Sequence, residues 1–148
     1  MTIADFLSQS DVIVDVHAVD KAQLLRELSK RAAASTKLDR DTVSTAILKR
    51  ESLGSTGTGG GIAIPHARFS NLKKPFGILA RLNKAVDFEA IDSKPVDIVF
   101  LLLLPGAGES AQLNALASVA RKLRNSEITA SIRRANDCAE MYRAIRID

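Results

Sequence analysis

Along the first half of the chain, the spacing of the apolar positions changes from that of a strand to that of helices. Residues 12–16 have the branched, apolar composition of a strand. Apolar residues then recur at helical spacing over 24–32, after a capping pattern at 20–23, which predicts a helix to about Ala34. A short helical segment at 3–7 precedes the strand, so a helical turn, a strand and a helix are expected in that order.

A second helix is predicted where Asp39 or Asp41 can cap an apolar stripe at 43–47. Continuing that stripe by three positions reaches Arg50, in the last turn before Gly54. Two interpretations of this arginine stay open. It points toward whatever the following loop surrounds, or it is a cation favoured by the C-terminal end of a helix.

In the second half, the longest apolar run, at 96–104, is too short for a membrane span and predicts a central strand covered on both faces. Strand-like segments at 76–82 and 86–88 flank the pair Asn83-Lys84, which predicts a hairpin. Helical spacing predicts three further helices, which begin near Ser110, Ser126 and Asp137.

Five of the eight glycines fall within 54–61, a density that argues against a helix or an ordinary strand there. Exposed amides in such a loop can form a concave anion site. A short buried strand is predicted at 62–64, and Pro65 ends it, so His66 stands on a constrained backbone just beyond the strand. P-loop and dinucleotide motifs are excluded, because an extended segment opens at Ile62 where both require a helix.

Composition limits the class of protein. With 148 residues, 46% of them hydrophobic, the chain fits one domain with one core. The net charge of +4 is spread along a chain with 4% aromatic residues, which argues against nucleic acid and favours acidic protein surfaces. Cys138 is the only cysteine and no secretory signal is apparent, so we expect a cytoplasmic protein. The cysteine and the two distant histidines give no metal-ligand spacing, so neither metal nor cofactor is expected.

Two consecutive motifs carry a resemblance to a known family: Arg50-Glu51-Ser52-Leu53-Gly54-Ser55-Thr56-Gly57, then Gly59-x-Gly61-Ile62-Ala63-Ile64-Pro65-His66. They are similar to the signature of the IIA components of the phosphoenolpyruvate-dependent phosphotransferase system, of the mannitol/fructose type and its nitrogen-regulatory branch. The similarity covers essentially the whole chain. It implies an α/β fold, a single-domain sandwich over 1–148, with a mixed central β-sheet of about five strands flanked by helices on both faces.

The resemblance also implies that His66 takes a phosphoryl group from a histidine phosphocarrier protein and that Arg50 helps to hold it. The chain would then be a phosphotransferase-system component, a phosphoryl carrier rather than a stand-alone turnover enzyme. Its further partners would be regulated target proteins, with sensor kinases and potassium transport components as candidates, and neither nucleic acid nor membrane insertion is expected.

The chemistry of the residues agrees with that role. With an ordinary pKa of about 6.5, histidine is largely neutral near pH 7, so a ring nitrogen is available to accept a phosphoryl group. In-line transfer needs alignment and positive potential, which the hydroxyls of Ser55 and Thr56 and loop amides such as that of Gly57 can supply. Arg68 is a candidate for the rim that meets an acidic partner, although a solvated charge is the commoner interpretation.

One departure from the family leaves the function open. The family usually has a second histidine in the first turn of the helix after the central strand, and by that register the residue here is Gln112. Glutamine can donate a hydrogen bond to a phosphoryl oxygen but cannot become cationic. The alternative function is therefore a regulatory binding module of the same fold that is poorly phosphorylated or not phosphorylated. A small-anion or nucleotide sensor is less favoured, because no base- or ribose-recognition pattern is present.

Overall fold

The computed structural model describes residues 2–106 and 109–147, with residues 109–112 described by their backbone alone. A six-stranded mixed sheet has the order β1-β5-β6-β3-β2, and β4 also pairs with β6. The strands are β1 (Val12–Val16), β2 (Gly57–Gly59), β3 (Ile62–Ala63), β4 (His66–Phe69), β5 (Phe76–Val86) and β6 (Val96–Pro105). As predicted, the apolar run forms the central strand: β6 pairs with β5 on one side and with β3 and then β4 on the other.

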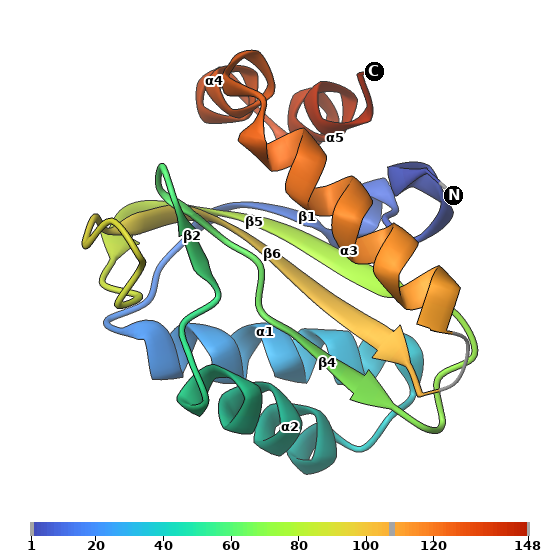
Figure 1. Cartoon of the computed structure of the whole chain (residues 1–148). Coiled ribbons are helices and arrows are strands. Elements are labelled where there is room, and N and C mark those ends of the chain that lie inside the picture. The colour runs from blue at the N-terminus through green and yellow to red at the C-terminus, as the bar shows by residue number, and fades with distance from the viewer. Residues whose placement is uncertain (1, 107–108, 148) are drawn as a thin grey trace.

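Helices cover both faces of this sheet, as Figure 1 shows. One face carries α1 (Lys21–Thr36) and α2 (Arg40–Ser52), and the other carries α3 (Glu109–Arg124), α4 (Ser126–Arg134) and α5 (Cys138–Arg146). Two short 3-10 helices, at Ile3–Asp5 and Gln9–Asp11, precede β1. The mixed α/β sandwich implied by the family resemblance is therefore confirmed.

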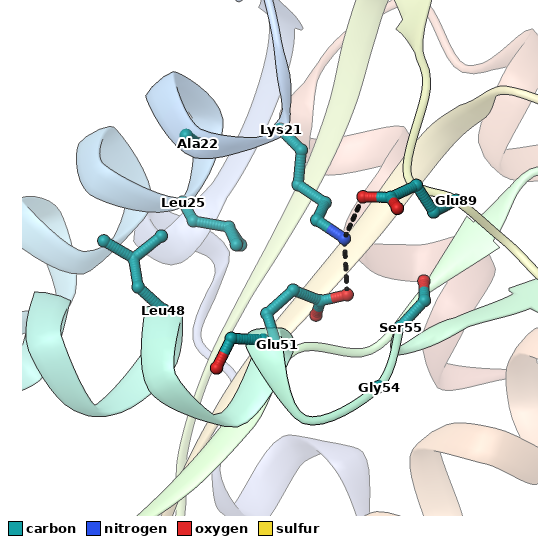
Figure 2. A pocket seen from close by; sticks show the side chains of 9 residues that line it. Lys21, Ala22, Leu25, Leu48, Glu51, Gly54, Ser55 and Glu89 are labelled. Atoms are coloured by element: carbon teal, nitrogen blue, oxygen red, sulfur yellow. Dashed lines mark hydrogen bonds and ion pairs between the residues drawn. The ribbon is translucent and has the colours of Figure 1, made fainter.

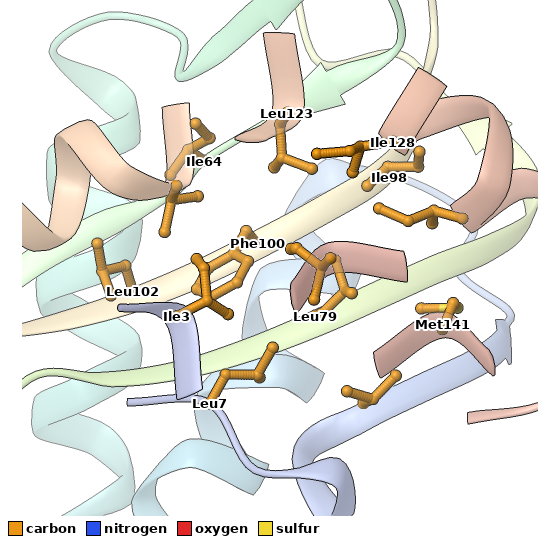
Figure 3. Close-up of a cluster of buried hydrophobic side chains, with 14 of the residues drawn as sticks. Ile3, Leu7, Ile64, Leu79, Ile98, Phe100, Leu102, Leu123, Ile128 and Met141 are labelled. Atoms are coloured by element: carbon orange, nitrogen blue, oxygen red, sulfur yellow. The ribbon is translucent and has the colours of Figure 1, made fainter. Parts of the chain in front are cut away.

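Alternation along the central strand divides the apolar core into two clusters. Phe100 and Leu102 face the helices of the C-terminal layer, whereas Val99 and Leu101 face α1 and α2. Figure 3 shows the first cluster, which includes Ile3 from the N-terminal 3-10 helix and Phe100 from β6. Side chains of successive strand residues point to opposite faces, so a near-continuous apolar run is what a strand covered on both faces requires.

Local capping agrees with the sequence at α1, α2 and α5. The Asp20 carboxylate accepts the Gln23 N–H at 2.8 Å, and Asp39 rather than Asp41 caps α2. At α5, the Asp137 carboxylate accepts the Glu140 N–H at 2.8 Å. The cap of α4 is Asn125, one residue before the predicted start. The helix expected near Ser110 begins at Glu109, so Ser110 lies inside α3, where its side chain is outside the described part.

The predicted hairpin at Asn83-Lys84 is wrong. Phe76–Val86 is one strand, and both residues are exposed positions within it. Between the pairs Arg81↔Ile98 and Val86↔Val96 the register shifts, so extra residues of β5 bulge out while pairing with β6 continues. The bulge accommodates the turn-forming residues without reversing the chain.

Two short strands near the glycines were also missed. Gly57–Gly59 forms β2, which is antiparallel to β3, although the glycine density argued against a strand. His66–Phe69 forms β4, which is parallel to β6, so His66 opens a strand as well as following one. Both are short segments held by their partner strands, and composition gives little signal for such pairing.

Candidate functional site

His66 is fixed in space by the backbone on both sides of it. The Leu102 N–H donates to the Pro65 carbonyl oxygen at 2.9 Å, and His66 is in register with Leu102 at the start of β4. Proline leaves no N–H at position 65, and its fixed φ restricts the approach to the strand. The histidine therefore stands where the chain changes from β3 to β4, beside the central strand.

The imidazole is half-buried, and one of its two nitrogens is engaged. Nδ1 lies 2.8 Å from the carbonyl oxygen of Ile64. A carbonyl oxygen only accepts, so Nδ1 carries the proton, and in the neutral ring Nε2 is then the nitrogen with the free lone pair. This arrangement leaves Nε2 as the ring nitrogen that is available to a ligand.

The pKa of His66 is held below its ordinary value of 6.5. Burial is the main cause, because it disfavours the charged ring, and the nearby charges of Arg50 and Arg68 act in the same direction. The Ile64 carbonyl and the Glu51 carboxylate oppose this shift. The ring is thus neutral near pH 7, which keeps the Nε2 lone pair available.

His66, Arg50 and Arg68 line one pocket of about 460 Å³, together with Lys49. Apolar side chains make up the rest of the wall, at Ala46, Leu53, Ala67, Leu104, Leu113 and Leu116. Among the described residues that line it, none is acidic. Positive charge beside a half-buried imidazole suits a transferring phosphoryl group, whose negative charge it stabilises.

Arg50 comes from the end of α2, and the structure combines both interpretations of it. Its side chain lines the His66 pocket, and one N–H donates to the carbonyl oxygen of Gly54 at 2.9 Å, past the end of the helix. An arginine has five N–H donors, so this bond occupies only part of its capacity. Arg68 is exposed on β4, at the edge of the same pocket.

The other proposed phosphate-binding residues have different surroundings. Ser55 Oγ donates to the carbonyl oxygen of Phe88 at 2.5 Å and lines a second pocket. The hydroxyl and the N–H of Thr56 both donate to Glu51. A Cβ on Gly57 would lie 2.7 Å from that of Ala90, so this glycine allows close packing. The phosphate-binding role of these three residues stays a prediction, and the Gln112 side chain lies outside the described residues.

The strands β2 and β3 form a hairpin over residues 57–63, called the glycine hairpin here, and hydrogen bonds hold its tip on both sides. The Gly60 N–H donates to Asp92 at 2.9 Å, and the Gly60 carbonyl oxygen accepts from Arg133 at 2.8 Å. Arg133 also forms two bonds to Asp97, at 2.8 and 2.9 Å. Gly60 has a φ of +67°, which glycine adopts at little cost. Gly60 therefore lies in a turn that is restrained from both sides.

Sequence reasoning assigned no role to Glu51, which directly follows Arg50. Its side chain is only 3% exposed and accepts from Lys21 Nζ at 3.0 Å (Figure 2). The helical spacing already placed Glu51 on the core-facing stripe, because Glu51 lies four positions after Ile47, whereas Arg50 lies three positions after it. The buried face of α2 thus ends in the Glu51 carboxylate, and the preceding residue, Arg50, lines the His66 pocket.

Within the described ranges, no group of three or more potential ligand side chains could hold a metal ion. In the same ranges, no helix has the length and apolar character needed to cross a membrane.

Comparisons with known proteins agree on one family. Residues 5–147 match the family described as phosphoenolpyruvate-dependent sugar phosphotransferase system, EIIA 2. A nitrogen regulatory protein of Bradyrhizobium diazoefficiens is 38% identical over 147 residues, covering 99% of this chain and 96% of that protein. The crystal structure of nitrogen regulatory protein IIA-Ntr from Neisseria meningitidis superposes with a TM-score of 0.92 at 31% identity, covering 97% of this chain and 98% of that one.

A more distant solved structure shares the fold. It is the complex of enzyme IIA-mannitol with phosphorylated enzyme IIB-mannitol from Escherichia coli, with a TM-score of 0.79 at 15% identity, covering 94% of this chain and 96% of that one.

Proposed function

The chain belongs to the EIIA 2 family of the phosphoenolpyruvate-dependent sugar phosphotransferase system, and from this premise we propose that Nε2 of His66 accepts a phosphoryl group from a histidine phosphocarrier protein. Family membership supports a phosphoryl-carrier and regulatory role. The observation that carries the proposal is the Nδ1 bond of His66 to the Ile64 carbonyl oxygen, in a pocket whose charged lining is cationic. The phosphorylation state then regulates partner proteins.

The transfer exchanges one N–P bond for another. The Nε2 lone pair of His66 attacks phosphorus in line, and the N–P bond of the donor breaks, with its electron pair returning to the donor imidazole. The His66 ring keeps its Nδ1 proton and becomes cationic, so its bond to the Ile64 carbonyl becomes charge-assisted and stronger. Arg50 is proposed to pair with the phosphoryl oxygens through its remaining N–H donors, with support from Ser55, Thr56, Gly57 and Gln112 as the sequence predicted.

The rim of the pocket suits a protein donor. Leu53 and Leu113 are 79% and 64% exposed, and Lys49 and Arg68 lie beside them. An apolar centre edged with cations fits a partner whose phosphohistidine is surrounded by apolar and acidic side chains. We propose that the phosphocarrier docks here, and that regulated target proteins recognise the same surface. A cytoplasmic location and a single domain over 1–148 stay predictions.

The test is phosphorylation of the purified chain. It is incubated with phosphoenolpyruvate, the general phosphotransferase enzyme and its histidine phosphocarrier, and then weighed intact by mass spectrometry. We expect one acid-labile phosphate adduct that is absent from His66→Ala. The matched control is His17→Ala, which removes the other histidine, an exposed residue after β1, and is expected to keep the adduct.

An unmodified parent chain at high carrier concentration would contradict the proposal and leave the regulatory binding module as the function. An adduct that survives in His66→Ala would contradict the choice of residue.

A further inference from the structure

Glu51 is a buried carboxylate to which the proposed phosphoryl transfer assigns no task. It accepts from Lys21 Nζ at 3.0 Å, from the Thr56 N–H at 2.9 Å and from the Thr56 hydroxyl at 2.5 Å. Three donors thus converge on one carboxylate whose side chain is 3% exposed. Each bond to a charged, buried group is stronger than a neutral bond at the surface.

The bonds continue from Thr56 to the imidazole. The Thr56 carbonyl oxygen accepts the Ile64 N–H at 3.1 Å, and the Ile64 carbonyl oxygen holds His66 Nδ1 at 2.8 Å. Thr56 immediately precedes β2, and Ile64 immediately follows β3, so this path crosses the base of the glycine hairpin. A displacement of Thr56 therefore moves Ile64 through this bond. Among the described residues, the Ile64 carbonyl is the only group that hydrogen-bonds the His66 ring and so fixes its tautomer.

We propose that Glu51, held by Lys21, is a positioning residue for His66, which sets the place and tautomer of the imidazole through Thr56 and Ile64. The inference rests on the proposed phosphoryl transfer and goes beyond it, because it assigns a part of the transfer rate to an ion pair outside the His66 pocket. Glu51 and Lys21 line a separate pocket on the other side of the end of α2.

A general argument and one structural observation favour positioning over plain stabilisation. A buried ion pair often adds little net stability compared with apolar groups of the same volume, so stability alone is a weak reason for this one. Glu51 is also adjacent to Arg50, so the bonds that hold Thr56 fix the end of α2 that presents Arg50 to the pocket. One carboxylate thereby sets the distance between the phosphoryl acceptor and its neighbouring cation.

Figure 2 shows a matched control within the same cluster. Glu89 lies 3.6 Å from the same Lys21 nitrogen, but its side chain is 81% exposed. Among the described residues, no hydrogen bond links the Glu89 side chain to Thr56, so Glu89→Gln removes a charge beside Lys21 and leaves the path to His66 intact.

The experiment compares Glu51→Gln with Glu89→Gln by two measurements. Nitrogen-15 NMR of the His66 imidazole in the unphosphorylated chain gives the tautomer. Single-turnover transfer from the phosphorylated carrier, followed over a range of carrier concentrations, gives the limiting rate constant and the half-saturating carrier concentration, which are written kcat and KM here. For Glu51→Gln we expect a smaller Nδ1–H fraction and a fall in kcat of about tenfold, as for a displaced reacting group, with KM unchanged because the rim is untouched. Glu89→Gln is expected to match the parent chain.

A second pair of variants keeps the test decisive if Glu51→Gln does not fold. Thr56→Val removes the hydroxyl bond to Glu51 together with any contact of that hydroxyl with the phosphoryl group, so the unphosphorylated chain is the decisive sample. There we expect a smaller Nδ1–H fraction in Thr56→Val, which Thr56→Ser restores. A folded Glu51→Gln or Thr56→Val with the tautomer and kcat of the parent would overturn the proposal. A parent chain that takes no phosphate would refute the transfer instead, since the NMR comparison needs no phosphorylation.

Discussion

Replacing Leu113 by alanine removes an exposed apolar side chain from the rim of the His66 pocket while keeping a good helix former in α3. Fully burying a leucine contributes roughly 1.5–3 kcal/mol. Because Leu113 is 64% exposed, a docked partner can remove about that share from water, which gives roughly 1–2 kcal/mol. We therefore expect KM for the phosphorylated carrier to rise about 5- to 30-fold, with kcat unchanged.

The assay is the initial rate of transfer measured over a range of carrier concentrations. Ile147→Ala is the matched control, because Ile147 is 60% exposed but lies after α5 and outside the pocket. An unchanged KM in Leu113→Ala, or an equal rise in Ile147→Ala, would refute the assignment of the rim as the docking surface.

Three further predictions concern the hairpin and the pocket. Gly61→Ala should destabilise the chain by about 2 kcal/mol or more in denaturant unfolding, because φ is +81° and the new Cβ would meet Arg133 at 2.6 Å, whereas Gly54→Ala, with open space, should change little. An NMR titration of His66 should give a pKa below 6.5 that rises in Arg50→Gln. Because folding lowers the pKa of His66, the folding stability linked to this ring is present above pH 6.5 and is lost as the pH falls through the folded pKa. An increase of that folding stability on acidification would contradict the shift. Gln112→His should speed phosphorylation or lengthen the life of the adduct, and an unchanged rate and lifetime would show that charge there is unimportant.

The strands and helices with strong periodicity were predictable from the chain alone. The run that forms β6 and the caps at Asp20 and Asp137 are local signals, and local signals suffice for them. The continuous β5 was not predictable in the same way. Asn83 and Lys84 favour a turn locally, but pairing with β6 on both sides of the bulge decides the structure.

The candidate site, like the fold, could be predicted from the sequence only in part. The sequence singled out His66, Arg50 and Arg68, which line one pocket. It gave no sign that the Thr56 hydroxyl donates to Glu51, because that bond depends on how the loop returns to the end of α2. Nor could it anticipate the exposed leucines of the rim. The helical spacing that predicted α3 does not show that Leu113 is 64% exposed, because its exposure depends on how the helix packs against the sheet.

The most direct test of the central claim is the position of the phosphoryl group in the phosphorylated chain, determined by phosphorus-31 and nitrogen-15 NMR. The bond of His66 Nδ1 to the Ile64 carbonyl oxygen predicts a phosphoryl group on Nε2 of His66, with the Nδ1 proton retained. A phosphoryl group on Nδ1, on His17 or on any other side chain would contradict it.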